Sequence, residues 1–258
     1  MKQLTALVLA GTRASGDPLA AYAGVSHKAL IEVGGRTMIE RVVSALAAVP
    51  EVARIVVAIE RPELLTDLPE LQPNVCTKPL TTMAPASGPS ATVAAALASE
   101  GSPLLVTTAD HALLQTNWLS EFLAACPEHA DVCVALGRSD LVQAAAPNTK
   151  RTWLRFTDGH FSGCNLFFMA RPAAAGAAEL WCELERHRKD PLQLMRRLGW
   201  SVALRYQMGQ LTLAAALGRL GELAGGARLA IVEMSDGRAA IDVDKPEDLD
   251  LVRQLVGR

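Results

Sequence analysis

The N-terminal part of the chain carries a glycine-containing loop followed by two separated cations. Residues 7–30 read LVLAGTRASGDPLAAYAGVSHKAL, with Gly11 and Gly16 in the loop, Arg13 between them and Lys28 beyond. Glycine lets backbone N–H groups approach phosphate oxygens closely. Arg13 offers a planar fork of hydrogen-bond donors and Lys28 a compact charge. The pattern indicates a cradle for the triphosphate of a nucleotide.

Two other phosphate-binding loops fit this segment less well. A Walker P-loop needs Lys and then Ser or Thr after GxxxxG, but Gly16 is followed by Asp17 and Pro18. A dinucleotide-binding GxGxxG loop needs glycine where Arg13 stands, although Glu32 lies about where a ribose-binding acid would fall. Two solvated loop charges with no ligand remain the structural alternative.

Carboxylates follow two segments that lie far apart in the sequence. The apolar run 104–107 leads into Asp110, and ligands of open α/β sheets bind at the carboxyl ends of the strands. Asp242 and Asp244 stand two residues apart, so an extended backbone would direct both to the same side. Such oxygens can hold a hard divalent cation together with phosphate groups. Capping of the helix expected from Pro246 is the alternative role of Asp244.

Short apolar runs alternate with helical patterns, which is typical of an open α/β sheet. The expected strands are residues 4–10, 55–59, 104–107, 132–136, 153–156, 164–169 and 229–234. The expected helices are residues 37–48, 90–99, 118–125, 173–198 with a break at Asp190-Pro191, and 246–255. Residues 79–89 and 138–152 are expected to be irregular.

The composition excludes several classes of protein. The chain has 258 residues, half of them apolar, and a formal net charge of −2, without the basic excess that nucleic-acid binding usually shows. Five scattered cysteines without a CxxC pair argue against a disulfide framework or a zinc site and fit a reducing cytoplasm. The N-terminal apolar run is short for a signal peptide, and no run approaches the ~20 residues of a membrane span. We expect a cytoplasmic protein.

The order of these motifs resembles the nucleotidyltransferases with a GT-A-like fold. This family includes sugar-phosphate pyrophosphorylases, the methylerythritol-phosphate cytidylyltransferase and the molybdenum-cofactor (MobA-like) guanylyltransferase. Its first strand ends in L-A-[AG]-G, followed by an arginine loop, a lysine and a G-[GK]-x-[PTS]-[ML] turn. This chain has LAG at 9–11, Arg13, Lys28 and GGRTM at 34–38. Its segment IDVDKPEDL at 241–249 resembles the family's I-D-[IV]-[DN]-[TK]-P-E-D-L. Two departures are His27, where proline is common, and the missing proline after Asp110.

The resemblance implies a Rossmann-like three-layer α/β/α fold with a mostly parallel mixed sheet, forming a single domain over residues 1–258. Residues 1–136 would bind the nucleotide and residues 137–235 the acceptor. Residues 236–258 would complete the metal site and end in a helix. The implied activity transfers NMP from an NTP to a small phosphorylated acceptor, such as a sugar, polyol or cofactor-precursor phosphate, and releases pyrophosphate.

The resemblance also implies roles for individual residues. Arg13 would hold the β- and γ-phosphates and Lys28 the α-phosphate. Mg²⁺ would be held by Asp110 and Asp244, with Asp242 as a second ligand or water-shell partner. Further nucleotide contacts are expected from Leu9, Ala10, Gly11, Thr12, Gly16, Gly88 and Ser90, and acceptor contacts from Lys150, Arg151 and Asn165. A helix N-cap role for Ser90 and a backbone partner for Asn165 are the alternatives.

Two other functions remain open at this point. A non-catalytic nucleotide- or sugar-binding protein would share the fold. An NAD(P)-binding Rossmann oxidoreductase would need the second and third glycines of the GxGxxG loop and a hydride-transfer site, and the sequence shows neither. The basic cluster of His187, Arg188, Lys189, Arg196 and Arg197 fits a solvated helix face or a second phosphate or partner surface. The chain is also a possible homo-oligomer.

Overall fold

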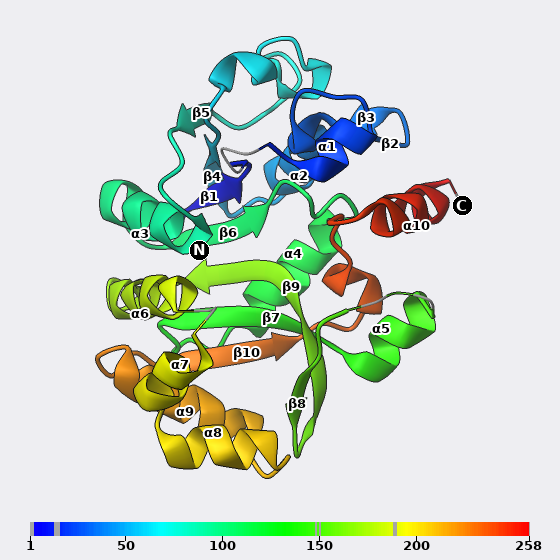
Figure 1. Ribbon diagram of the computed structural model, residues 1–258. Helices are drawn as coiled ribbons and strands as arrows, with labels where there is room; N and C mark the ends of the chain where they lie inside the picture. The colour runs from blue at the N-terminus through cyan, green and yellow to red at the C-terminus, as the bar shows by residue number, and fades with distance from the viewer. Residues whose placement is uncertain (1–2, 13–15, 148, 150, 188–189, 258) are drawn as a thin grey trace.

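A computed structural model describes residues 3–12, 16–147, 149, 151–187 and 190–257 of the protein (Figure 1). Within these ranges, eight strands form a central sheet in the order β10-β7-β9-β6-β1-β4-β5, with β8 paired to β9. Their bounds are β1 Leu4–Leu9, β4 Val52–Ala58, β5 Leu80–Met83, β6 Leu104–Thr108, β7 Val132–Arg138, β8 Leu154–Phe156, β9 Gly159–Met169 and β10 Leu229–Glu233. β2 (Glu32–Val33) and β3 (Arg36–Thr37) form a separate antiparallel hairpin.

The central sheet is mixed but mostly parallel. β1 runs parallel to β4 and β6, β4 to β5, and β7 to β10. β9 is antiparallel to its neighbours β6 and β7. The expected Rossmann-like α/β fold with a mostly parallel mixed sheet is therefore confirmed.

Helices cover both faces of this sheet (Figure 1). They are α1 Pro18–Tyr22, α2 Met38–Ala47, α3 Pro89–Glu100, α4 Thr116–Ala125, α5 Ser139–Ala145, α6 Ala174–Arg186, α7 Pro191–Leu198, α8 Trp200–Gln207, α9 Leu213–Leu223 and α10 Pro246–Val256. Side chains of β1 alternate between the two faces. Ala6 and Val8 pack in the core that contains α2 and α4, whereas Leu7 packs in the core with α3 and α6. Both faces are buried, which produces three layers.

Some elements differ from the sequence expectation. The segments 79–89 and 138–152, expected to be irregular, contain β5 and α5. β5 is an edge strand with partly or fully exposed side chains, and α5 buries only Val142, so neither shows an apolar pattern. The break at Asp190 is confirmed, since this side chain accepts a hydrogen bond from the backbone of Gln193 and begins α7. α8 and α9 were not expected.

The sheet topology brings distant segments to one edge. Because β1, β4 and β6 are parallel neighbours, the residues that follow them meet at their carboxyl ends. α2 is fixed nearby by a capping box, in which Thr37 Oγ1 accepts from the backbone of Glu40 and the Glu40 carboxylate accepts from that of Thr37. Among the described residues, no helix has the length and apolar character that crossing a membrane requires.

Candidate active site

A cleft of about 1000 Å³ opens at the carboxyl ends of β1, β4 and β6. Residues expected to bind nucleotide or metal line it together: Leu9, Ala10, Gly11, Thr12, Gly16, Lys28, Gly88, Asp110 and Asp244. Gly11 allows its loop to pack against the segment after β5, because a Cβ there would lie only 3.1 Å from Cβ of Pro85. The cleft is large enough for a nucleotide and a second small molecule.

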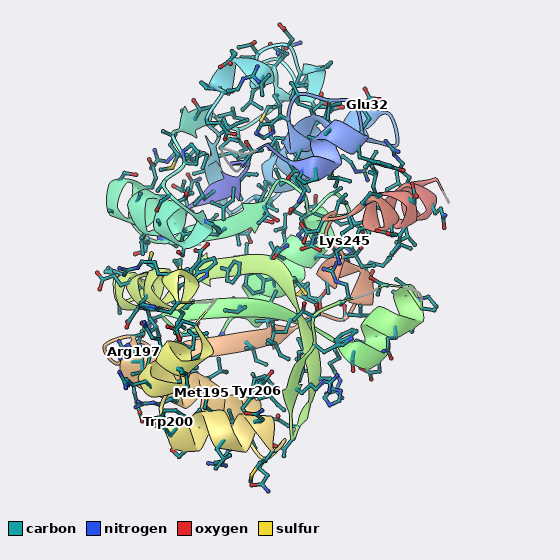
Figure 2. All side chains as sticks on the ribbon, viewed as in Figure 1. Glu32, Met195, Arg197, Trp200, Tyr206 and Lys245 are labelled. Carbon is teal, nitrogen blue, oxygen red and sulfur yellow. The ribbon has the colours of Figure 1, made fainter. Side chains whose placement is uncertain are left out.

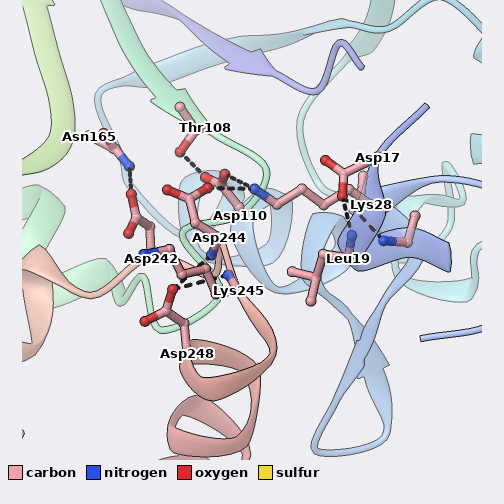
Figure 3. A network of polar contacts seen from close by, with 12 residues as sticks. Asp17, Leu19, Lys28, Thr108, Asp110, Asn165, Asp242, Asp244, Lys245 and Asp248 are labelled. Atoms are coloured by element: carbon pink, nitrogen blue, oxygen red, sulfur yellow. Dashed lines mark hydrogen bonds and ion pairs between the residues drawn. The ribbon is translucent and has the colours of Figure 1, made fainter. Parts of the chain in front are cut away.

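The polar centre of the cleft is the ammonium group of Lys28 (Figure 3). Its Nζ donates to Asp110 Oδ2 at 2.7 Å and to Asp244 Oδ1 at 2.8 Å. Thr108 Oγ1 donates to the other oxygen of Asp110 at 2.5 Å, which orients that carboxylate. Burial acts to lower the pKa of Lys28, but the two carboxylates outweigh it and raise that pKa. The cluster of Lys28, Asp110 and Asp244, called the lysine cluster below, thus contains a permanently charged lysine and two acids.

The donor set of the lysine cluster fits a divalent metal ion. Asp110 and Asp244 already converge on one cation, and both offer the carboxylate oxygens that Mg²⁺ prefers. The described residues contain no group of three or more His, Cys, Asp or Glu side chains able to hold a metal. Two carboxylates completed by phosphate oxygens and water match the usual way in which Mg²⁺ binds at phosphoryl-transfer sites.

Asp242 lies beside the lysine cluster but has different partners (Figure 3). One of its oxygens accepts from Arg151 and the other from Asn165 Nδ2 at 2.7 Å. Arg151 also donates to the carbonyl of Ala240. Burial raises the pKa of Asp242, and Asp110 and Asp244 act in the same direction against Arg151. We call Asp242, Arg151 and Asn165 the arginine cluster. Asp242 does not line the cleft and accepts from Arg151 and Asn165 instead of Lys28, so it is the weakest of the three expected metal ligands.

Asp244 and Asp248, two acids near the start of α10, have different partners. Asp248 Oδ2 accepts from the backbone N–H groups of Asp244 and Lys245, at 3.2 and 3.1 Å. Asp248 therefore caps this helix, as an acid of its first turn is expected to do. The carboxylate of Asp244 contacts Lys28 instead, so the alternative in which Asp244 serves only as a cap is wrong.

Glu60 contacts residues of the cleft and was missed by the sequence interpretation. It lies two residues beyond the end of β4, and both its oxygens accept from the backbone N–H of Thr12 at 3.2 Å. Its Oε1 also lies 3.5 Å from Nε2 of His27, whose Nδ1 accepts from the backbone of Ala29. Glu60 thus joins the loop after β1 to the residue before Lys28. The position of Glu60 at a strand end was the same signal that identified Asp110.

Glu185 is the second missed residue, and it reaches the cleft from α6. Its Oε2 accepts from the backbone N–H of Ser90 at 3.1 Å, and a Cβ on Gly88 would lie 3.1 Å from its Oε1. The side chain of Ser90 is buried, and Gly88 occupies the N-cap of α3. The N-cap alternative for Ser90 is therefore wrong. Nothing in the sequence near Glu185 signals this approach, because it depends on how α6 packs against α3.

Two expected residues, Arg13 and Lys150, lie outside the described residues. Of the other acceptor candidates, Arg151 has only 9% of its side chain exposed, and Asn165 is half-buried. Asn165 adopts a left-handed backbone with φ of 50°. The register of β7 against β9 shifts between Val134 and Leu136, opposite this residue. The bulge aims Asn165 at Asp242.

Comparisons with known proteins agree on the class of fold and family. The family model described as the MobA-like NTP transferase domain matches residues 6–220. A hypothetical transferase from Thermus thermophilus is 30% identical, with a TM-score of 0.80 over 96% of this chain and 100% of its own. The comparison with curated proteins found no match.

More distant solved structures share the architecture. A 4-diphosphocytidyl-2C-methyl-D-erythritol synthase from Anaerococcus prevotii is 11% identical, with a TM-score of 0.62 over 100% of this chain and 99% of its own. A 2-C-methyl-D-erythritol 4-phosphate cytidylyltransferase from Thermus thermophilus is 16% identical, with a TM-score of 0.53 over the whole of both chains. At these identities the likeness shows the fold alone.

Proposed function

The chain belongs to the MobA-like NTP transferase family, and we propose that it transfers a nucleoside monophosphate from an NTP to a small phosphorylated acceptor. Pyrophosphate is the second product. The observation that carries the proposal is the lysine cluster, in which Lys28 joins Asp110 and Asp244 inside a nucleotide-sized cleft. A cation and two carboxylates at one point of the cleft are what a triphosphate and its metal ion require.

The proposed reaction needs no covalent protein intermediate. An oxygen of the acceptor phosphate attacks the α-phosphorus of the NTP, the bond from this phosphorus to the bridging oxygen breaks, and pyrophosphate leaves. A phosphate acceptor is already ionised at neutral pH, so the reaction needs no general base. The protein must position two anions that repel each other and offset the charge that develops between them.

Each residue of the cleft has a proposed role in this positioning. The N–H groups of the loop after β1 would bind the phosphates, with Arg13 on the β- and γ-phosphates. Lys28 would leave its carboxylate partners for the α-phosphate. Asp110 and Asp244 would hold Mg²⁺, which offsets phosphate charge when bound. The loop through Gly88 would contact the base or ribose.

The acceptor is proposed to bind beside the arginine cluster, which contains Asn165. Lys150 and Asn165 are the candidate contacts for the acceptor phosphate and its hydroxyl groups. Arg151 is buried and engaged by Asp242 and Ala240, so we assign it to positioning the segment that carries Asp244. A sugar, polyol or cofactor-precursor phosphate would suit this polar region equally.

The test is a pyrophosphate-release assay with the full chain, each of the four NTPs, Mg²⁺ and pooled sugar and polyol phosphates. We expect one NTP and one acceptor class to give turnover. Lys28→Met and Asp110→Asn should each lower kcat/KM by about 10²–10³-fold, the usual effect of removing one electrostatic contact to a transition state. Lys78→Met and Asp250→Asn are matched controls outside the cleft lining, and they should retain full activity.

The same panel separates the enzyme from a binding protein of the same fold. Tight NTP binding with no pyrophosphate release from any combination would favour the non-catalytic alternative. An Asp110→Asn variant with full turnover would contradict the proposed metal ligand. The oxidoreductase alternative has no support from the family or from the solved structures.

A further inference from the structure

An apolar surface lies on the outward sides of α7 and α8, remote from the lysine cluster in sequence. Leu192 is 67% exposed, Trp200 55%, Leu204 57% and Met208 52%. Together with Tyr206 they make up five of the nine large hydrophobic side chains that are exposed among the described residues. Such a concentration within 17 positions is unlike the scattered exposed hydrophobics of an ordinary surface.

Helix geometry accounts for this surface. In α8, Trp200, Leu204 and Met208 follow at intervals of four and therefore share one face. The opposite face, with Val202 and Ala203, is half-buried. Tyr206 anchors that side, because its hydroxyl accepts from the backbone of Arg155 at 3.3 Å and its ring packs edge-on against Phe156.

α7 repeats the same arrangement. Leu192 and Arg196 are exposed one turn apart, while Leu194, Met195 and Leu198 are half-buried on the other side. We call the exposed set the α7–α8 surface, which consists of Leu192, Arg196, Trp200, Leu204, Arg205 and Met208. Figure 2 shows Trp200 at the outer edge of the molecule, and Figure 1 shows α8 at the end opposite α1 and α2. The surface therefore lies at an extremity of the molecule.

The charge of this region is positive, although the whole chain carries a net charge of −2. Residues 191–221 include Arg196, Arg197, Arg205 and Arg219 and not one Asp or Glu. Arg197 pairs with Glu183 of α6, and Arg219 pairs with Glu222. The structure gives Arg196 and Arg205 no acidic partner among the residues that it describes. The α7–α8 surface thus combines four apolar side chains with two arginines.

We propose that the α7–α8 surface binds the protein peripherally to anionic phospholipid membranes. Trp, Leu and Met would enter the boundary between headgroups and acyl chains, while the arginines would contact lipid phosphates from the same helices. This is the arrangement of an amphipathic helix that lies in a membrane interface. The proposal does not depend on the transfer reaction.

Two other occupants fit the surface less well. In a two-fold dimer through this face, Arg196 and Arg205 of both copies would approach one another with no acid from residues 191–221 to offset them. A nucleic acid would gain little from four large apolar side chains and would favour a wider basic stripe. Anionic lipid matches both the apolar and the charged residues.

The test is co-sedimentation of the full chain with vesicles of equal parts phosphatidylglycerol and phosphatidylcholine, compared with pure phosphatidylcholine, at low and high salt. We expect binding to the anionic vesicles that weakens with salt. The double variant Trp200→Ser, Leu204→Ser should lower the partition coefficient at least about tenfold. The double variant Arg196→Gln, Arg205→Gln should lower it about fivefold for each arginine.

Tyr22→Ser is the matched control, because Tyr22 is a 60% exposed aromatic residue on α1. It should leave vesicle binding unchanged. The arginine variant alters no apolar packing, so it tests the proposal even if the Trp200 variant folds poorly. Absence of binding to anionic vesicles, or equal binding to neutral ones, would overturn the proposal. A dimer in light scattering that the Trp200 and Leu204 substitutions dissociate would overturn it in favour of a second copy.

Discussion

The lysine cluster and the arginine cluster are neighbours that differ in net charge (Figure 3). In the first, one cation serves two carboxylates, and Asp244 has 60% of its side chain exposed. In the second, one carboxylate serves a guanidinium and an amide, and both charged side chains are largely buried. Asp242 and Asp244 are separated by one residue, yet each belongs to a different cluster.

This difference separates an exchangeable site from a fixed one. The lysine cluster carries an excess negative charge, lines the cleft and has one exposed acid, Asp244, so it can accept a further cation and release Lys28 to a phosphate. The arginine cluster is electrically balanced and both carboxylate oxygens of Asp242 are engaged, so a loss of Asp242 leaves a buried charge without its partner. The first arrangement suits chemistry, and the second fixes the segment that delivers Asp244 to the cleft.

The largest expected effect comes from replacing each of the two acids by alanine in turn. Asp242→Ala leaves the buried guanidinium of Arg151 unpaired and should lower the free energy of unfolding by about 3–5 kcal/mol. Asp244→Ala removes an exposed acid from an over-acidic cluster and should change that free energy by less than about 1 kcal/mol. It should nevertheless abolish most pyrophosphate release. Urea unfolding followed by circular dichroism gives the first quantity, and the transfer assay gives the second.

Asp242→Asn is the matched control, because it keeps the shape and one acceptor oxygen for Arg151. It should be less destabilising than Asp242→Ala. If Asp242→Ala unfolds at the urea concentration of the unmodified protein, the arginine cluster does not have the structural role assigned to it. Equal destabilisation by Asp242→Ala and Asp244→Ala would remove the distinction between the clusters.

The parts of the fold that sequence predicted are those fixed by local pattern. Buried parallel strands such as β1 and β6 are continuous apolar runs, and Asp110 is placed by its position after such a run. The resemblance to a family assigned Lys28 and Asp244 to the site. Lys28 contacts Asp110, 82 positions away in the sequence, and Asp244, 216 positions away. The periodicity of apolar residues is a local pattern and does not predict contacts between residues so far apart in the sequence.

The failures have physical causes as well. The alternation rule placed Asp242 and Asp244 on one side, but residues 241–244 form no regular strand, so the rule does not hold there. Glu60 was overlooked although it follows a buried strand. Glu185 contacts the α3 start only through the packing of α6. α8 was not expected, and its exposed apolar face is an exception to the rule that large hydrophobic residues are buried.

The second largest expected effect is a change in metal affinity, and this prediction rests on the proposed metal site. Lys28→Met removes the internal cation that neutralises Asp110 and Asp244. In the absence of nucleotide, Mn²⁺ should then bind at least about tenfold more tightly, because a dication no longer competes with the ammonium group. The variant should still be catalytically poor. Mn²⁺ titration followed by electron paramagnetic resonance measures the affinity without activity.

Lys78→Met is the control for this titration, since Lys78 does not line the cleft. It should leave Mn²⁺ affinity unchanged. An affinity that falls in Lys28→Met, or stays constant, would mean that Lys28 and the metal ion do not share the two carboxylates. The lysine cluster would then be a fixed structural ion pair, as the arginine cluster is, and the proposed difference between the two clusters would be wrong.

The smallest expected effect concerns Asn165, which could be required for its hydrogen bond to Asp242 or for its left-handed backbone. Asn165→Ala loses the hydrogen bond to Asp242 and keeps a β-carbon in a left-handed backbone, with φ of 50°, without the polar side chain that makes asparagine tolerant of this conformation. Asn165→Gly loses the same bond but adopts that backbone without strain. The glycine variant should therefore be more stable than the alanine variant by about 1 kcal/mol in urea unfolding. Equal stabilities would show that the bulge in β9 relaxes when its contact is lost. In that case the contact between Asn165 and Asp242 would stabilise the bulge, and the bulge would not by itself fix the position of Asn165.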